Sequence, residues 1–486
     1  MQKIHLAALM ITALVCLSVC SLNSSTPIRT DIQKASAGSQ SYSGPGKQFF
    51  EAMLESARRN PEAVRLIAEG ADALGRGDVA RGEEYFQRVL TMDPKFFGIH
   101  LLLGAAYLDQ GKVEQGLAEL AKEEENYPGN SVIYHTTAEL LLETDHKQEA
   151  LATLRKWVAA DRDNLDAALE LGEMLSDNQM YAEAVQVLER TRSLSPGSAK
   201  AQSALADAYF KNRQMEQGRS LLKKGLPASA SPEDLGRAAY ILADNNVELD
   251  LANIYAERAL FQLEAESAAT NDEAIGIANT LNLGYLWDVM GWINFRLGHY
   301  QAAISSLEAA WLLSQRPEAG DHLGQAYEKL GRKEEAAHSY VLAGAAAFGD
   351  AEDIRKRYEA LTGKKMGDVH TAPSRHGPNA TAKASDASPV EELSRLRTVN
   401  ITKSPHASAN AIFSIVFSVD RPAEVKYLSG AESLEMLAGQ ISSAKFNVKF
   451  PDSSQVRLFR RGMMVCGSVT GCDVVLLLPG SVHDAD

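Results

Sequence analysis

The sequence contains few cysteines, an excess of acidic over basic residues and only one long apolar run, and each feature excludes a class of protein. Only four of the 486 residues are cysteine, and two of these lie within the first twenty positions, which excludes a disulfide-dense scaffold. The formal net charge is −14, whereas a nucleic-acid-binding protein needs a basic face to contact phosphates. Beyond its start, the chain has no apolar segment of membrane-spanning length.

The sequence also lacks the short motifs that carry catalysis. It contains no G-x-S-x-G, H-E-x-x-H or Walker-type motif, and no G-x-G-x-x-G after a strand. Asp321 and His322 are adjacent, but such a pair is more typical of a helix start with a surface imidazole. We therefore predict no enzymatic activity, no cofactor and no metal site. An unrecognised hydrolase is the alternative.

What the sequence does contain begins with an apolar N-terminus. Lys3 precedes an apolar run from Leu6 to Val19 that is too short for an ordinary membrane span, and a serine-rich stretch follows. This pattern is typical of a secretory signal peptide over residues 1–22 and predicts export to the periplasm or cell envelope. Two alternatives stay open, namely an uncleaved anchor and lipidation at Cys20. Val19 departs from the small residue that normally precedes a lipidated cysteine.

A repeat of 34 residues runs through the middle of the chain, with windows that begin at Phe97, Ser131, Leu165 and Ala199. Each window has a small residue at its eighth and twentieth places and leucine at its twenty-fourth. These residues are Gly104, Ala138, Gly172 and Ala206; Gly116, Ala150, Ala184 and Gly218; and Leu120, Leu154, Leu188 and Leu222. Apolar residues three and four apart form one face of a helix, and small residues let two antiparallel helices pack closely. Each window therefore predicts a helical hairpin, and stacked hairpins share one core.

This pattern resembles the tetratricopeptide repeat (TPR). The residues that match the family in one well-defined copy are Trp287, Met290, Gly291, Ala303, Leu307 and Ala310. The resemblance implies a mainly α solenoid of about eight hairpins with a capping helix over residues 63–364. The period slips between residues 233 and 283, where about a dozen extra residues precede Trp287. Ala252, Ala256 and Ala259 still mark a second helix there.

The resemblance also implies which side chains line the concave groove of the repeats. They are Glu139, Glu143, Glu173, Asp177, Asp207, Phe210, Lys211, Asp288, Trp292, Phe295 and Arg296, with His135, Leu169, Lys200 and Tyr285 beside them. Because residues 63–364 carry 30 basic and 47 acidic side chains, we expect the groove to bind a basic peptide or protein segment with an apolar anchor. Two alternatives stay open. The carboxylates form an ordinary solvated face, and Trp292 and Phe295 pack against the irregular repeat.

Two polar segments flank the repeats. Residues 23–62 are predicted to be partly disordered, and residues 365–398, rich in alanine, serine, proline and glycine, are predicted to be a flexible linker.

Residues 399–486 predict a small α+β domain with eight basic and eight acidic side chains. The expected order is β-β-α-β-β-β, with strands at AIFSIVFSVD, AEVKYLSG, FNVKFPD, VRLFRRGMMVCG and CDVVLLLPG. Leu434, Leu437 and Ile441 form the apolar face of its helix. The stretch SIVFSVDRPAEVKYLSG and this helix resemble the C-terminal domain of TonB-type envelope proteins, which implies a docking role. An ordinary α+β fold would share the order.

Cys466 and Cys472 flank a Gly-Ser-Val-Thr-Gly turn between the last two strands. The spacing does not fit a C-x-x-C redox motif, and two thiols without a nearby pair of histidines make a poor zinc site. In an exported protein we expect a disulfide that closes the hairpin. Two free, half-buried thiols are the alternative.

Together these features predict a non-enzymatic interaction scaffold of the bacterial cell envelope. Its partner is a protein or peptide, not a nucleic acid, and its contact with a membrane is limited to the N-terminal segment. The alternative is an accessory subunit of an envelope transport or enzyme complex whose catalysis lies in another chain.

Overall fold

The computed structural model describes residues 61–76, 78–347, 351–366, 388–402, 408–419, 421–451, 456–467 and 471–479. The chain divides into two compact units, Met1–Gln214 (unit 1) and Met215–Asp486 (unit 2). The predicted signal peptide lies outside the described residues. So do all but the last two residues of the predicted segment 23–62.

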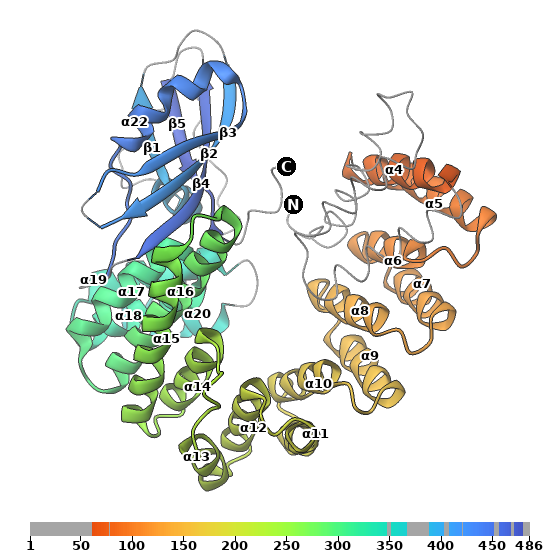
Figure 1. The fold of residues 1–486 in the computed structure, drawn as a ribbon, viewed down its shortest axis with the longest axis horizontal. Coiled ribbons are helices and arrows are strands. Elements are labelled where there is room, and N and C mark those ends of the chain that lie inside the picture. Colours follow the sequence, from red (N-terminus) through yellow and green to blue (C-terminus); the bar gives the residue numbers. More distant parts are fainter. Residues whose placement is uncertain are drawn as a thin grey trace. The chain divides into compact units, whose positions relative to one another are not determined.

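Unit 1 is a run of helices that pair in sequence order. They are α4 (Pro61–Gly75), α5 (Val79–Met92), α6 (Ile99–Asp109), α7 (Val113–Asn126), α8 (Ser131–Glu143), α9 (Lys147–Ala160), α10 (Leu165–Asp177), α11 (Tyr181–Leu194) and α12 (Ala199–Lys211). Figure 1 shows α6, α8 and α10 along one side of this unit and α7, α9 and α11 along the other. The windows predicted to begin at Ser131, Leu165 and Ala199 coincide with the first residues of α8, α10 and α12, which confirms the phase of the repeat.

Each hairpin is held by contact between a small residue on one helix and a large residue on the other. A Cβ at Gly104 would lie 2.7 Å from Cδ2 of Leu120, and a Cβ at Gly172 would lie 2.5 Å from Leu188. Such distances are too short for carbon atoms that are not bonded, so the leucine would have to shift if either glycine carried a side chain. The close approach predicted at these places of the repeat is confirmed.

The turn inside a hairpin needs one residue in the left-handed region, at the same place in each repeat. Gly111, Asp145, Gln179 and Arg213 have φ values of 71°, 63°, 62° and 63°. Only Gly111 adopts this conformation without a steric cost at Cβ. The tight turn is therefore kept in the other three hairpins by the packing of the helices on either side of it.

Unit 2 begins with α13 (Met215–Lys223), α14 (Pro232–Asp244), α15 (Leu249–Ala269), α16 (Glu273–Arg296), α17 (Tyr300–Ser314), α18 (Pro317–Lys329), α19 (Lys333–Ala346) and α20 (Glu352–Thr362). Helices α15 and α16 are long, with 21 and 24 residues. The extra residues of the irregular repeat therefore lengthen two helices and do not form a loop. Within the described ranges, no helix combines the length and the apolar character needed to cross a membrane.

Unit 2 also contains a five-stranded antiparallel sheet of order β1-β5-β4-β2-β3. Its strands are β1 (Thr398–Thr402), β2 (Ala409–Ser418), β3 (Glu424–Gly430), β4 (Arg457–Gly467) and β5 (Gly471–Leu476). A 3-10 helix, η3 (Glu432–Leu437), and the short α22 (Ala438–Ser442) connect β3 to β4. They bury Leu434, Leu437 and Ile441, the apolar face predicted for this helix.

Two parts of the predicted strand order are wrong. The stretch FNVKFPD was expected to be a strand, but its described residues, 446–451, form none. Lys449 in this stretch pairs instead with Glu308 of α17 at 2.6 Å. Strand β1 was not predicted: Val399 and Ile401 alternate with polar residues in TVNIT, but the segment has only five residues.

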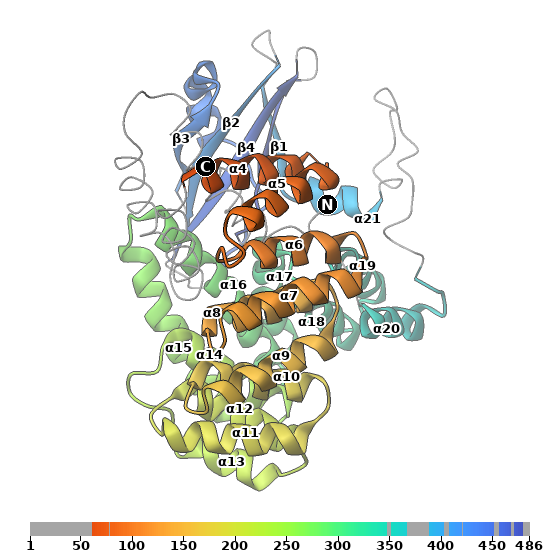
Figure 2. The ribbon, with the colours of Figure 1, turned by 90° about the vertical axis from the view of Figure 1, so that its right-hand side faces the viewer.

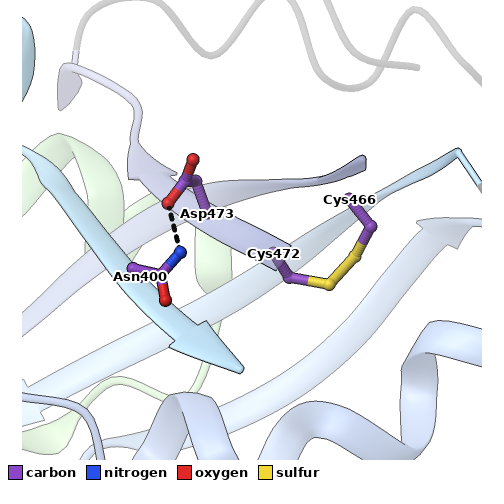
Figure 3. The surroundings of a disulfide bond; sticks show 4 residues. All are labelled: Asn400, Cys466, Cys472 and Asp473. Atoms are coloured by element: carbon purple, nitrogen blue, oxygen red, sulfur yellow. Dashed lines mark hydrogen bonds between the residues drawn. A yellow bond between two sulfur atoms is a disulfide. The ribbon is translucent and has the colours of Figure 1, made fainter. Parts of the chain in front are cut away.

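Strands β4 and β5 form the expected hairpin, with Cys466 directly opposite Cys472. The two Cα atoms lie 4.1 Å apart and a disulfide joins the side chains (Figure 3). Beside it, Asn400 of β1 donates a hydrogen bond to Asp473 of β5 at 3.0 Å. Both cysteines are buried.

The sheet packs directly on α15 and α16. Figure 1 shows β4 as the strand nearest to these helices. Phe459 of β4 and Val416 of β2 form a buried cluster with Ile277 of α16. A Cβ at Gly276 would lie 2.4 Å from the ring of Phe459, so the absence of a side chain lets the ring rest on the helix backbone.

Hydrogen bonds fix the position of β4 on these helices. Ser267 of α15 donates its hydroxyl hydrogen bond to the carbonyl of Arg457 at 2.6 Å. The N–H of Phe459 donates to the hydroxyl of Thr280 on α16 at 2.8 Å. Arg461 pairs with Glu273 at the start of α16, at 3.2 Å.

Arg460 of β4 joins the sheet to α17 from a buried position. Its guanidinium donates to the carbonyl of Leu313 at 2.8 Å and to the carbonyl of Leu477 at 2.7 and 3.0 Å. Burial, with a smaller contribution from Arg397, lowers the pKa of Arg460 to about 9. The group stays charged at neutral pH, and these carbonyls replace the water that burial removes.

The predicted linker ends in packed structure. Helix α21 (Pro389–Arg395) is capped by Ser388 and buries Leu393 in the core of α17–α20. Gln315 donates a hydrogen bond to the carbonyl of Leu393 at 2.9 Å. Figure 2 shows α21 beside β1. Residues 367–387 of the predicted linker lie outside the described residues.

The C-terminal sheet is therefore not a separate compact unit. The compact unit that contains the sheet begins at Met215 and includes the helices α13–α20. The physical reason is the buried contact of β4 with α15 and α16, which the sequence pattern of a single strand does not reveal.

Replacing Gly276 by alanine is expected to destabilise unit 2. The new methyl group would overlap the ring of Phe459, and overpacking of this kind costs about 1–3 kcal/mol. In a helix without this contact the same change would stabilise by up to about 1 kcal/mol. The free energy of unfolding in urea measures the effect. Gly439→Ala is the matched control, because a Cβ there meets no atom within 4 Å; equal unfolding free energies for the two variants would contradict the docking.

Candidate partner-binding surface

Carboxylates gather on the first helices of two neighbouring hairpins in unit 1. Glu139 lies on α8, and Asp166, Glu170 and Glu173 lie on α10. Spacings of three and four residues bring the three side chains of α10 to one face. We call these four residues the acidic cluster.

His135 of α8 lies within the acidic cluster. Its Nδ1 is 3.5 Å from Glu139, and its Nε2 is 3.7 Å from Glu170 on the neighbouring helix. Burial lowers the pKa of His135, although the charge of Asp166 opposes this shift. The imidazole is therefore neutral at neutral pH and does not offset the surrounding carboxylates.

Crowding in the acidic cluster affects the protonation of Glu170. Burial is the largest cause that raises the pKa of Glu170 to about 7, followed by repulsion from Glu139 and smaller effects of Asp166 and Glu173. Lys200 of α12 opposes the shift only in part. A cation placed here would relieve this repulsion. Among the described residues, no group of three or more potential ligands is arranged to hold a metal ion.

Charges are more nearly balanced where α10 and α12 end. Lys211 lies 2.9 Å from Asp207 and 3.8 Å from Asp177. Burial alone would lower the pKa of Lys211, but Asp207 and Asp177 raise it above its usual value. These three predicted groove residues therefore interact with one another.

Two predicted groove residues of unit 1 belong to the core. Phe210 is 3% exposed and Leu169 is 4% exposed. Phe210 is therefore not available as a contact for an apolar anchor. The side chain of Glu143 lies outside the part of the chain that the structure describes.

In unit 2, Trp292 is a packing residue. It is 5% exposed and its ring is stacked between His322 at 4.1 Å and Phe295 at 4.8 Å. Phe295 and Tyr285 are half-buried. The alternative in which these aromatic residues pack against neighbouring repeats accounts for their positions.

Asp288 and His322 lie on successive repeats and interact in the interior. They are 34 positions apart in the sequence, and Nδ1 of His322 is 2.9 Å from Asp288. Burial alone would lower the pKa of His322, but Asp288 and Asp321 raise it above the usual value. The expectation of a surface imidazole at a helix start is wrong, because His322 lies inside α18 and is buried beneath Trp292.

Arg296 completes this closed arrangement. Its guanidinium donates to the carbonyls of Ala243 and Asp244 on α14, at 2.9 and 2.8 Å, and lies over the ring of Trp292. Asp288, Trp292 and Arg296 thus join α14, α16 and α18. In unit 2 the predicted groove residues stabilise the stack of hairpins and leave little polar surface for a ligand.

Sequence reasoning missed Glu170 and the Asp288–His322 pair. Glu170 falls outside the groove positions carried over from the family, although its spacing from Asp166 places both on one helix face. The Asp288–His322 pair could have been predicted, because the two residues are separated by one repeat length of 34 residues.

Family models for the tetratricopeptide repeat match residues 67–131, 135–199, 175–243 and 321–343. The matched segments come from both units. In these segments the chain consists of tetratricopeptide repeats, and such repeats indicate a protein–protein interaction scaffold.

Relatives are similar over part of the chain. The TPR repeat-containing protein YpiA of Bacillus subtilis is 22% identical over 250 residues, which are 49% of this chain and 59% of that protein. The chain thus spans about three-fifths of this relative. A solved tetratricopeptide repeat protein from Parabacteroides merdae is 15% identical, with a TM-score of 0.41 over 62% of this chain and 99% of its own. Yeast Tom70 is 17% identical, with a TM-score of 0.39 over 71% and 77%.

Glu170 should make stability depend on pH. Its pKa is 4.5 in the unfolded chain and about 7 in the folded protein, so the folded state holds the proton more tightly. This stabilisation is complete below pH 4.5 and is lost as the pH rises to about 7. The free energy of unfolding of Glu170→Gln should therefore equal that of the wild type at pH 4. At pH 8 it should be higher than that of the wild type by about 1 kcal/mol, allowing for solvent screening.

Urea denaturation at a series of pH values measures this difference. Glu125→Gln is the control, because Glu125 is exposed on α7, outside the acidic cluster. Wild-type and Glu170→Gln stabilities that stay parallel from pH 4 to pH 8 would show that Glu170 is not crowded by its neighbours.

Proposed function

We propose that the protein is a non-enzymatic scaffold, exported to the bacterial cell envelope, which binds a basic segment of a partner protein at the acidic cluster of α8 and α10. The repeats supply rigid helices, and the partner supplies lysine or arginine side chains. The observation that carries this proposal is the crowding of carboxylates about Glu170, which raises its pKa to about 7, with Glu139 and Glu170 at 3.5 and 3.7 Å from the neutral His135.

Charge complementarity of this kind increases association rate and selectivity. A basic side chain would lower the repulsion that Glu139, Asp166 and Glu173 exert on Glu170. The helices of the binding surface are already held in place by glycine-to-leucine contacts. Little conformational entropy is therefore lost when the partner binds.

The residues that were expected to contact an apolar side chain of the partner are not exposed for such a contact. Phe210 and Trp292 are buried, and Arg296 and Phe295 take part in the packing of unit 2. The proposal therefore rests on charge. The charged side chains that would bind the partner lie on α8 and α10 of unit 1, and the aromatic residues of unit 2 take no part in this binding.

The N-terminal sequence and the cysteine pair support export. Residues 1–22 have the pattern of a secretory signal peptide, and disulfides persist in oxidising compartments. The order β2, β3 ending at Gly430, η3 with α22, and β4 supports the likeness to the C-terminal domain of TonB-type envelope proteins. A docking role for this region is compatible with its packing on α15 and α16.

Reversing charge in the acidic cluster should abolish most of the binding. In Glu139→Lys/Glu173→Lys the affinity for a short lysine-rich peptide with one leucine should fall about tenfold or more, because attraction becomes repulsion. Isothermal titration calorimetry at low and physiological salt measures the change, and the affinity for the wild type should fall as salt increases.

The matched control is Glu114→Lys/Glu125→Lys on α7, which changes the net charge equally at exposed positions outside the cluster. It should bind almost as tightly as the wild type. An equal loss in both double variants would mean that the peptide responds to the overall charge and has no specific site.

The exported protein should contain no free thiol at Cys466 or Cys472. Protein recovered from the cell envelope should take up no alkylating reagent until it is reduced, and its chain should begin near residue 23. Replacing both cysteines by serine should lower the unfolding free energy by about 2 kcal/mol, since a short loop is no longer closed in the unfolded chain. Two alkylated cysteines in the unreduced, exported protein would contradict the disulfide.

A further inference from the structure

The side of β4 that contacts α15 and α16 has a basic–aromatic–basic alternation. Arg457, Phe459 and Arg461 are spaced two residues apart, so their side chains share one face of the strand. Phe459 rests against Gly276 of α16, and Arg461 pairs with Glu273 of the same helix at 3.2 Å. The strand therefore presents to the helices an extended segment in which two arginines flank an aromatic ring.

The helices supply the acceptors for the cationic groups of the sheet region. Arg457 donates hydrogen bonds to the carbonyl of Thr270, where α15 ends, and to the side-chain oxygen of Asn271, at 2.7 and 3.0 Å. The C-terminal end of a helix carries partial negative charge, which attracts a guanidinium. Lys449, which precedes β4, pairs with Glu308 of α17 at 2.6 Å. In each of these contacts the sheet region supplies the cation and the helical region supplies the oxygen atom.

The apolar part of the contact is small. Within the described residues, Ile277, Val416 and Phe459 form the buried cluster between the sheet and α16. Interfaces within a chain that have little apolar area resemble transient protein–protein interfaces, for which relative motion is expected. The sheet also has apolar contacts of its own, because η3 and α22 contact β1, β2 and β3 and bury Leu434 and Ile441. We therefore expect the sheet to keep its own core when it leaves the helices.

The buried Arg460 is compatible with such a release. Its hydrogen bonds to the carbonyl of Leu477 lie within the sheet region and do not depend on the helices. Its bond to the carbonyl of Leu313 on α17 would pass to water.

We propose that α15 and α16 form an interaction site which β4 occupies in cis, within the same chain, as an autoinhibitory contact. The ligand in trans is an extended segment of a partner protein in which arginine or lysine residues flank an aromatic residue. Its basic residues pair with Glu273 and with the carbonyl of Thr270, and its ring takes the place of Phe459 against Gly276. This site lies in unit 2 and does not involve the acidic cluster of unit 1.

The connection within one chain favours the contact in cis. A tethered segment has an effective concentration of about 1 mM when its linker is short and flexible. The apparent affinity of a partner falls in proportion to the fraction of molecules in which the site is free. Weakening the contact of β4 should therefore strengthen the binding of a partner.

A synthetic peptide with the sequence of residues 457–461, RLFRR, tests the proposal by fluorescence anisotropy on the full chain. Arg457→Glu/Arg461→Glu (the released variant) should bind the peptide about tenfold or more tightly than the wild type, because repulsion removes the sheet from the site. Lys426→Glu/Lys445→Glu is the matched control, which changes the net charge equally at exposed positions of the sheet region. It should bind the peptide as the wild type does.

Further substitutions locate the site in the released variant. Adding Glu273→Lys should abolish the gain in affinity, whereas adding Glu139→Lys/Glu173→Lys should leave the gain in place. The reverse result would assign the peptide to the acidic cluster and overturn this proposal. A peptide with alanine in place of phenylalanine, RLARR, should bind the released variant about tenfold more weakly than RLFRR, because the ring rests on Gly276.

A disulfide between sheet and helix gives an independent measurement. A Cβ at Gly276 would lie 2.4 Å from Cγ of Phe459. The Cβ atoms of two cysteines at these positions would therefore be at most about 3.9 Å apart, within reach of a disulfide. Oxidised Gly276→Cys/Phe459→Cys should not bind RLFRR and should bind it after reduction, and the wild type with and without reductant is the control.

Circular dichroism shows that each variant retains its fold. Equal affinities of the released variant and the wild type for RLFRR would overturn the proposal. So would equal affinities of the released variant for RLFRR and RLARR, or equal binding to the oxidised and reduced forms of Gly276→Cys/Phe459→Cys.

Discussion

The two helices of a hairpin lie so close at Gly104 and Gly172 that a methyl group does not fit between them. This contact sets the distance between the helices, because leucine on one helix rests on the backbone of the other. The same device recurs where Phe459 of the sheet rests on Gly276 of α16. The packing of the Gly104 and Gly172 hairpins in unit 1 and the docking of the sheet in unit 2 thus depend on a missing side chain.

The consequence for function differs between the two units. In unit 1 the first helices present an acidic cluster whose charges are only partly offset, at Glu170 above all. In unit 2 the corresponding helices are closed by an internal network, in which Trp292 stacks on His322 and Asp288 pairs with it. The same repeat positions thus carry charged side chains in unit 1 and packing residues in unit 2.

The sequence predicted the helical hairpins, their phase and their contacts because small residues recur every 34 positions. It also placed Cys466 opposite Cys472, since a short turn between two strands leaves little choice of register. It did not predict the docking of the sheet. Gly276 and Phe459 are 183 positions apart, and neither is distinctive in its own segment. It missed β1 because the alternation of Val399 and Ile401 with polar residues in TVNIT extends over only five residues.

The candidate site was predictable only in part. Glu139 and Glu173 follow from groove positions of the repeat, but the charge state of Glu170 depends on burial and on carboxylates from two helices. Trp292 had the sequence position of a groove residue, and only the packing of α14, α16 and α18 shows that it is covered. Residue type at a repeat position indicates a face of the helix, whereas neighbouring repeats decide whether that face is open.

Hydrogen–deuterium exchange of the full chain, with and without a bound lysine-rich peptide, tests the central claim most directly. The account predicts slower exchange in α8 and α10, where the acidic cluster lies, and unchanged exchange in α9 and α11 of the same hairpins. Slower exchange confined to α9 and α11, or spread evenly over unit 1, would contradict a binding surface on the first helices.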